Sequence, residues 1–512
     1  MSERGAGSLR APMLAAALAS CVFIAHGLVR LTGIEHNFDE GVYIQQARLV
    51  LAGERPYVDF FYHQTPLYLY TLAAFAAPAP DSLVAYRLLS LLASAASGLI
   101  VLAMARRLLP AWPAVFALIL FYTAPLQYYG MLALPNAVML CFATAGAWLL
   151  GFQRGGRSAA LGAALLVLAI LEKPLALPMA AAVGIAVLAD PTRRRDAGWA
   201  AAAALAAAGA SWLLFDRLSD GVFTELLGLQ AGRFSSKSGF ELMRGYPPFL
   251  MQLRSHGLHS AVAWNLYEHA RSLLLPGPFG NLHLVVLAVF GQVWVARRTP
   301  APWRGHRLLI TLLWSLPLVF SLFVWEPSWD HYFVQYLPAL SLLGGAALQG
   351  LWESRRAPRL GRATAILLVG LGAAAGAVHV GARTADYGRI PRPVVAGELW
   401  LTLDPFLNFV AGTKPACDLI DPFNVYSDRS LIALSNAPAW ERFRVDPEDL
   451  LDCLAADPSI RIAVGSVRSF FVDDALGEGL ERLEQADPGR FVRMPLDFKE
   501  RNRRSRHRSL LQ

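Results

Sequence analysis

The sequence predicts a polytopic α-helical membrane protein of about 11 transmembrane helices, with a small C-terminal α/β domain outside the cytoplasm. Three observations predict this class. Hydrophobic residues make up 55% of the 512 positions and charged residues only 16%, whereas soluble domains carry roughly 25% charged residues. Arginine clusters recur between long apolar runs. Those runs end before residue 384, where a more polar tail begins.

The apolar runs give the expected spans in chain order. Most approach the ~20 residues with which a helix crosses the hydrocarbon core. Two runs are shorter and are separated by Glu172, Lys173 and Pro174. The expected spans are residues 11–31, 83–105, 112–129, 132–151, 158–171, 174–190, 197–215, 279–297, 307–325, 332–351 and 362–381.

Basic residues occupy every second connection between these spans, and the positive-inside rule places such connections in the cytoplasm. The short alternate connections, YYGMLALPN and WEPSWDHY, contain no Lys or Arg. A transmembrane domain over residues 1–383 then has a cytoplasmic N-terminus and two outer loops, 32–82 and 216–278, and the tail 384–512 is also outside. The arginines that set this order include Arg4, Arg10, Arg106, Arg107, Arg154, Arg157, Arg193, Arg194, Arg195, Arg297, Arg298, Arg355 and Arg356. They account for much of the net charge of +8, so we expect no nucleic-acid partner.

The tail reads as a small soluble extracytoplasmic domain. IRIAVGSV at 460–467 predicts a strand, and DPEDLLDCLAAD at 446–457 predicts a helix with Asp446 at its N-cap. Cys417 and Cys453 would pair in an oxidising compartment, although sequence spacing leaves their distance open.

The first outer loop carries the acidic residues on which the functional prediction depends. Asn37 followed by Glu40 fits a capping box at a helix start, which predicts a structural role for Glu40. Asp39 is not needed for that box and shares a helix face with Tyr43 and Gln46. A carboxylate partly desolvated at a membrane boundary has a raised pKa and is a better base. Both Asp39 and Glu40 are therefore candidate catalytic residues.

Residues 38–70, FDEGVYIQQARLVLAGERPYVDFFYHQTPLYLY, resemble the first outer loop of GT-C superfamily membrane glycosyltransferases. The match is to the protein O-mannosyltransferase and aminoarabinose-transferase-like enzymes, and it rests on the Asp-Glu pair, Tyr43 and the segment PYVDF. The resemblance implies a GT-C fold, a catalytic acidic motif in this loop and a polyprenyl-phosphate-linked sugar donor. One position departs from the pattern. The aminoarabinose transferases have Glu-Lys-Pro at the end of the loop, whereas here Gln64, Thr65 and Pro66 follow, without the phosphate-contacting Lys.

Other cations are candidates for the donor phosphate. Lys173 is either a snorkelling side chain beside Glu172 or the phosphate ligand, and similar enzymes have a Lys at the outer start of the corresponding helix. His63 and His331 are further phosphate candidates, with structural roles as the alternative. Asp39, His63 and His331 would also supply ligands for a divalent metal, but no ligand spacing enforces such a site, so a metal requirement stays open.

The remaining candidates would contact substrate. Asp59 is expected to pair with Arg55 or Arg87, or to bind sugar hydroxyls. Tyr43, Tyr62 and Tyr332 are candidate substrate contacts. The aromatics around Asp59, which include Tyr62, are either interfacial anchors or flat surfaces for a sugar ring. Tyr332 would form a polar cluster over the cavity with Asp330 and His331, beside Glu326.

Together these features predict an inverting glycosyltransferase of the bacterial inner (plasma) membrane. It would move a hexosyl or pentosyl group from a polyprenyl-phosphate donor to a hydroxyl on a glycan, lipid or protein at the outer face. A transporter or flippase of a sugar-lipid is the alternative, although charges here lie at span ends and no internal repeat is evident. A noncatalytic assembly subunit of the same fold is a third interpretation.

Overall fold

The computed structural model divides into two compact units. The helical unit comprises Met1–Leu31, Arg87–Leu213 and Pro248–Arg383. The loop–tail unit comprises Thr32–Tyr86, Leu214–Pro247 and Thr384–Gln512. The structure describes residues 4–62, 64–221, 223, 281–298, 301–323, 330–354, 357–382, 398–402, 405–417, 446–464 and 474–493.

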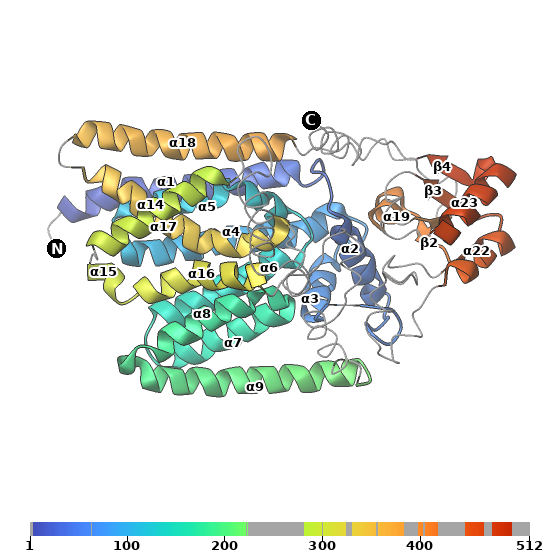
Figure 1. Cartoon of the computed structure of the whole chain (residues 1–512), viewed down its shortest axis with the longest axis horizontal. Coiled ribbons are helices and arrows are strands. Elements are labelled where there is room, and N and C mark those ends of the chain that lie inside the picture. The colour runs from blue at the N-terminus through green and yellow to red at the C-terminus, as the bar shows by residue number, and fades with distance from the viewer. Residues whose placement is uncertain are drawn as a thin grey trace, which may run out of the picture. The chain divides into compact units, whose positions relative to one another are not determined.

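The helical unit consists of helices that run side by side in Figure 1, with α9 and α18 at opposite edges of the view. α14 packs on α17, α5 packs on α17 and α1, and α16 packs on α8. α14 approaches α17 closely at Gly291, where an added Cβ would overlap the carbonyl oxygen of Leu343. The α-helices are α1 (Arg4–Arg30), α4 (Leu83–Leu108), α5 (Ala111–Thr123), α6 (Pro135–Ala147), α7 (Gly156–Glu172), α8 (Leu177–Leu188), α9 (Arg194–Leu218), α14 (Leu282–Arg298), α15 (Ala301–Arg304), α16 (Arg307–Phe323), α17 (Leu337–Trp352) and α18 (Pro358–Ala382).

Short 3₁₀ and π helices interrupt this bundle. The 3₁₀ helix η1 (Pro125–Met131) follows α5 at an angle of 64°. Ala124 has ψ 133° because the following Pro125 disfavours helical backbone in the residue before it. The other interruptions are η2 (Trp148–Phe152), η3 (Pro174–Ala176), η4 (Pro191–Arg193) and η5 (Asp330–Tyr336).

Five helices of the described residues are long and apolar enough to cross a membrane. They are Leu9–Arg30, Leu83–Leu108, Pro135–Phe152, Pro191–Leu218 and Pro358–Gly381, and the bent pair α5–η1 is a sixth candidate. The other expected spans coincide with the shorter helices α7, α8, α14, α16 and α17. A mostly helical chain with several apolar helices is confirmed, while the count of about 11 spans stays a prediction.

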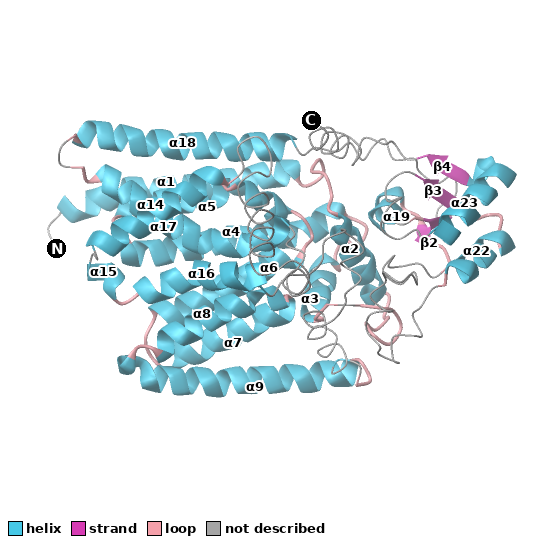
Figure 2. Cartoon of the chain, in the orientation of Figure 1, coloured by secondary structure: helices cyan, strands magenta, loops and turns pink. Residues whose placement is uncertain are grey.

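The loop–tail unit joins the first loop to the tail. The loop contributes α2 (Phe38–Leu51) and the apolar α3 (Leu67–Ala76), and the tail contributes a parallel four-stranded sheet of order β2-β1-β3-β4 (Figure 2). α22 and β3 lie where the sequence predicts a helix and a strand. The tail elements are β1 (Leu399–Leu401), α19 (Pro405–Ala411), β2 (Lys414–Pro415), α22 (Pro447–Ala456), β3 (Arg461–Val464), α23 (Asp474–Ala486), η8 (Pro488–Arg490) and β4 (Phe491–Arg493).

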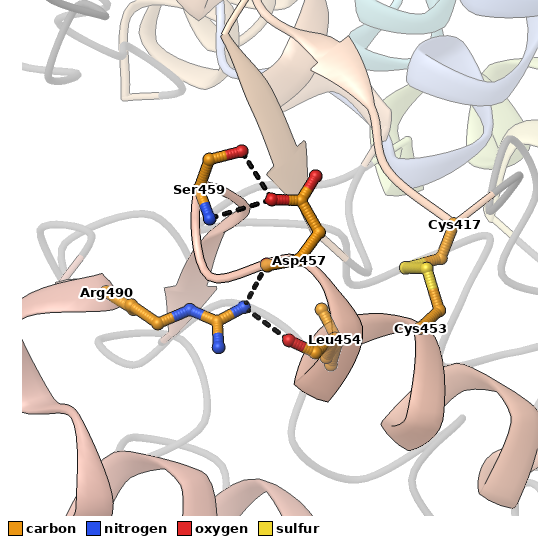
Figure 3. Close-up of a disulfide and its surroundings, with 6 residues drawn as sticks. All are labelled: Cys417, Cys453, Leu454, Asp457, Ser459 and Arg490. Atoms are coloured by element: carbon orange, nitrogen blue, oxygen red, sulfur yellow. Dashed lines mark hydrogen bonds between the residues drawn. A yellow bond between two sulfur atoms is a disulfide. The ribbon is translucent and has the colours of Figure 1, made fainter.

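A disulfide between Cys417 and Cys453 links the segment after β2 to α22, with the two Cα atoms 6.0 Å apart (Figure 3). The sequence left open whether these two cysteines pair, and they are paired in the structure. Beside it, the Arg490 guanidinium donates to the backbone oxygens of Leu454 and Asp457 at 2.7 and 2.9 Å. These bonds end α22 where the chain turns toward β3. The domain boundaries expected from the sequence stay predictions.

Candidate active site

The helix that carries the acidic pair begins where the sequence predicts. Asn37 is the N-cap of α2, with extended backbone at φ −95° and ψ 147°. Its side-chain oxygen accepts from the backbone N–H of Asp39 at 2.9 Å, one residue earlier than the expected capping box would require. The backbone N–H of Glu40 bonds to the carbonyl of Asn37 instead, at 3.0 Å. Asp39 and Glu40 therefore occupy the first turn, where the helix dipole favours negative charge.

The two carboxylates differ in exposure. Asp39 is half-buried, whereas Glu40 is fully enclosed at 0% exposed. Adjacent helical residues point about 100° apart, so the two side chains belong to different faces of α2. The face of Asp39 continues through Tyr43 to Gln46, and Gln46 donates from Nε2 to the carbonyl of Phe61 at 3.0 Å. This bond joins the Asp39 face to the aromatic segment of the loop.

Four buried tyrosines cluster within the loop. The ring of Tyr43 meets Tyr68 edge-on at 5.3 Å and Tyr62 at 6.5 Å. Tyr57 lies 5.8 Å from Tyr62 between ring centroids and donates its hydroxyl to the carbonyl of Gln64. Burial, with a smaller contribution from Tyr62, raises the pKa of Tyr57 well above its usual value of 10.0, so this phenol remains a donor at neutral pH. The expected substrate residues Tyr43, which is on the helix that carries Asp39, and Tyr62, from the segment after it, thus belong to one aromatic cluster.

Asp59 closes a turn with Arg55 and not with Arg87. Its carboxylate accepts from the backbone N–H of Arg55 at 2.7 Å and lies 3.8 Å from the Arg55 guanidinium. Arg87 is fully buried and donates to the carbonyl of Leu31 at 2.6 Å. The Arg55 pair is 41–48% exposed, so it adds little to stability. A contact of Asp59 with sugar hydroxyls stays a prediction.

A second group of predicted residues meets in the helical unit. Lys173 follows α7, is 4% exposed and donates from Nζ to Asn136 Oδ1 at 3.2 Å. The ammonium also stands 4.8 Å from the ring centroid of Tyr332. Asn136 donates from Nδ2 to the carbonyl of His331 at 2.7 Å, and the ring of His331 packs on Tyr129 and Tyr332. The structure therefore brings Lys173, His331 and Tyr332 together.

Asn136 was not among the predicted residues. It occupies the second position of α6, directly after Pro135, so its side chain belongs to the positive end of that helix. The signal that could have identified it is the uncharged connection ending in LPN, which introduces a helix start on the same side as Lys173. A buried ammonium beside a helix N-terminus is a setting in which anions bind. The buried position of Lys173 also differs from a snorkelling side chain that reaches water.

Two predicted features involve residues outside those that the structure describes. His63 is one of these residues, so its role as a phosphate or metal ligand stays a prediction. Most of the loop 216–278 also lies there. Among the residues that the structure describes, no group of three or more His, Cys, Asp or Glu side chains could hold a metal ion.

Comparison with known proteins finds a family that matches part of the chain and solved structures of similar fold. Residues 63–215 match the family of dolichyl-phosphate-mannose-protein mannosyltransferases. The oligosaccharyltransferase of Archaeoglobus fulgidus, solved with Zn and sulfate, is similar at a TM-score of 0.50 and 13% identity, over 80% of this chain and 62% of that one. ArnT from Cupriavidus metallidurans, solved with undecaprenyl phosphate, is similar at a TM-score of 0.48 and 15% identity, over 94% and 89% of the two chains. The comparison with curated proteins finds no match.

The family match confirms the resemblance to protein O-mannosyltransferases, and the archaeal oligosaccharyltransferase has a similar fold. The family match includes Lys173 and Asn136 and begins after the acidic pair. The chain spans less than two thirds of the archaeal oligosaccharyltransferase, so the similarity to that enzyme is one of fold.

Proposed function

We propose that this protein is an inverting glycosyltransferase that moves a sugar from a polyprenyl-phosphate donor to a hydroxyl acceptor at the outer face of a bacterial plasma membrane. The observation that carries the proposal is the buried Lys173–Asn136 contact within the segment that matches the mannosyltransferase family. The family that matches residues 63–215 is named for a dolichyl-phosphate-linked mannose, which supports a lipid-phosphate donor.

Asp39 is the proposed general base. It is the more accessible carboxylate of the pair, because Glu40 is fully enclosed. Asp39 takes the proton of the acceptor hydroxyl while that oxygen bonds to the anomeric carbon. The bond from the anomeric carbon to the phosphate oxygen breaks in the same displacement, and its electron pair leaves with the polyprenyl phosphate. A single displacement from the opposite side inverts the anomeric centre.

Lys173 is the proposed ligand of the leaving phosphate. A fixed cation stabilises the charge that develops on the phosphate as the bond breaks. Asn136 and Tyr332 hold the ammonium in place, so little side-chain freedom is lost when the donor binds. His331 and His63 are proposed as further phosphate contacts. Tyr43, Tyr62, Tyr332 and Asp59 are proposed to contact the sugar or the acceptor.

The experiment is turnover of a polyprenyl-phosphate sugar by the purified full-length protein in proteoliposomes, with a hydroxyl acceptor supplied on the outside. We expect Lys173→Ala to raise the donor KM, while Lys414→Ala, which removes an exposed lysine of the tail, leaves it unchanged. Donor affinity that is the same in both variants would remove the phosphate role from Lys173. Lipidomics of a deletion strain should show the accumulating donor and the missing sugar, which identifies the acceptor.

A transporter or flippase of a sugar-lipid is the alternative, and the break between α5 and η1 is the observation that favours it, because interrupted helices are common in transporters. The same proteoliposomes separate the two functions. Movement of the intact sugar-lipid between leaflets without transfer of the sugar would support the alternative and contradict the enzyme.

A further inference from the structure

The helix that carries Asp39 has a second face, opposite to the proposed catalytic one. Gly41 follows Asp39 by two positions and Arg48 follows it by nine. At about 100° per residue, they lie about 200° and 180° around the helix from Asp39. Both faces of α2 are covered within the loop–tail unit. The Asp39 face meets the aromatic cluster, whereas the face of Gly41 and Arg48 meets α19, a short helix from the tail.

The approach of α19 is closest at Gly41. A Cβ added there would overlap the backbone nitrogen of Phe406 and would stand 2.7 Å from its Cβ and 2.8 Å from its Cα. Only glycine permits this separation, because real Cβ contacts do not occur below 3.0 Å. The first turn of α2, which holds the acidic pair, is therefore in direct contact with the backbone of the tail.

Aromatic contacts extend the same interface in both directions along α2. The ring of His36, just before the helix, stacks on Phe406 with centroids 4.1 Å apart and planes 5° apart. One turn of α19 further on, Phe409 lies 5.8 Å from the guanidinium of Arg48 and meets Tyr86 edge-on at 5.6 Å. Phe406 is 0% and Phe409 8% exposed, so these rings are buried between loop and tail.

The other end of α19 is fixed to the tail sheet. The backbone N–H of Thr413 bonds to the carbonyl of Asn408 at 3.0 Å, and that of Lys414 bonds to the carbonyl of Glu398 at 3.1 Å. The disulfide at Cys417 follows directly and ties this segment to α22. A displacement of α2 at its acidic turn would therefore have to move a segment that is hydrogen-bonded and cross-linked to the rest of the tail.

We propose that α19 positions the catalytic helix, with Phe406 as the positioning residue that sets the first turn of α2 and hence the carboxylate of Asp39. The inference rests on the proposed role of Asp39 as the base. It assigns the tail a part in catalysis, as the support of the acidic turn. A displacement of about 1 Å at a reacting group can cost on the order of 10²-fold in rate, so this contact is expected to influence turnover strongly.

The test compares two substitutions of the same kind in the tail of the full-length protein. Phe406→Ala removes the ring against α2, whereas Phe491→Ala removes a ring that packs on the tail core at β4. We measure turnover, the donor KM, and hydrogen exchange of the α2 amides. Phe406→Ala should lower kcat by roughly 10- to 100-fold with an unchanged donor KM, and should raise exchange in α2. Phe491→Ala should leave kcat and α2 exchange as in the native protein.

Gly41→Ala keeps the test decisive if Phe406→Ala does not fold. It should also lower kcat, while Gly33→Ala, where an added Cβ meets nothing within 4 Å, should not. Faster α2 exchange with full kcat in Phe406→Ala would overturn the inference, as would equal effects of Phe406→Ala and Phe491→Ala. Failure of the proposed function is distinguishable, because Asp39→Asn would then be active whatever the α2 exchange rates show.

Discussion

Replacing Asn136 by Asp tests the phosphate role of Lys173 with almost no change in side-chain shape. Asn136 Oδ1 lies 3.2 Å from Lys173 Nζ, so a carboxylate at this position would face the ammonium directly. Opposite unit charges 4 Å apart interact by about 4 kcal/mol at an effective dielectric constant of about 20. If donor binding has to overcome half of this attraction, about 2 kcal/mol, the affinity for the donor phosphate falls roughly thirtyfold.

The assay is binding of radiolabelled polyprenyl phosphate to the full-length protein in nanodiscs. Asn136→Asp also loses the donor to the carbonyl of His331, which costs about 1 kcal/mol of stability, so the melting temperature is measured alongside. Gln292→Glu is the matched control, because it introduces a carboxylate at a part-buried amide of α14 that bonds to Thr311. Unchanged affinity in a folded Asn136→Asp protein would refute the assignment of Lys173.

Three further predictions follow from the tail and the topology. Replacing Cys417 and Cys453 by Ser opens a loop with a sequence separation of 36, and the chain-entropy model then predicts a loss of about 4 kcal/mol in unfolding free energy, measured by denaturant titration. A reporter fused after residue 384 should behave as external, and cytoplasmic behaviour would contradict the expected topology. Hydrogen bonds from Ser459 lower the pKa of Asp457 below 3.8, so their stabilisation is present above that pH and is lost as pH falls below it. We therefore expect the Ser459 amide to lose protection from hydrogen exchange as pH falls below 3.8, and Asp457→Asn to abolish this pH dependence.

Local chemistry made the start of α2 predictable. Asn37 and Asp39 are two residues apart, and a capping bond acts over that distance whatever the rest of the chain does. The position of α22 was predictable from another local feature, because Pro447 suits the first turn of a helix. The bend within the span expected at 112–129 was not predicted. It follows from Pro125, before which α5 ends, and the bent pair α5–η1 is one candidate span.

Contacts between distant segments were beyond local patterns. Lys173 and His331 could be named separately. For Asn136 the LPN connection indicates a helix start, but it does not show that this side chain bridges the other two. The contact of Gly41 with Phe406 joins the first loop to the tail, and no spacing rule connects positions so far apart. Packing in three dimensions decides both contacts, and the sequence shows only that each residue type would suit them.

The comparison of Asp39→Asn with Glu40→Gln in one reconstituted transfer assay tests the central claim most directly. Both changes keep the side-chain shape and remove the basicity, and the two residues differ in exposure, half-buried for Asp39 and fully buried for Glu40. We predict that Asp39→Asn lowers transfer by ~10²–10⁴-fold with unchanged donor binding, and that Glu40→Gln acts mainly on the melting temperature. A dead Glu40→Gln beside an active Asp39→Asn would reverse the two roles. Normal turnover by both variants would contradict the account, because the acidic turn of α2 would then not be the catalytic site.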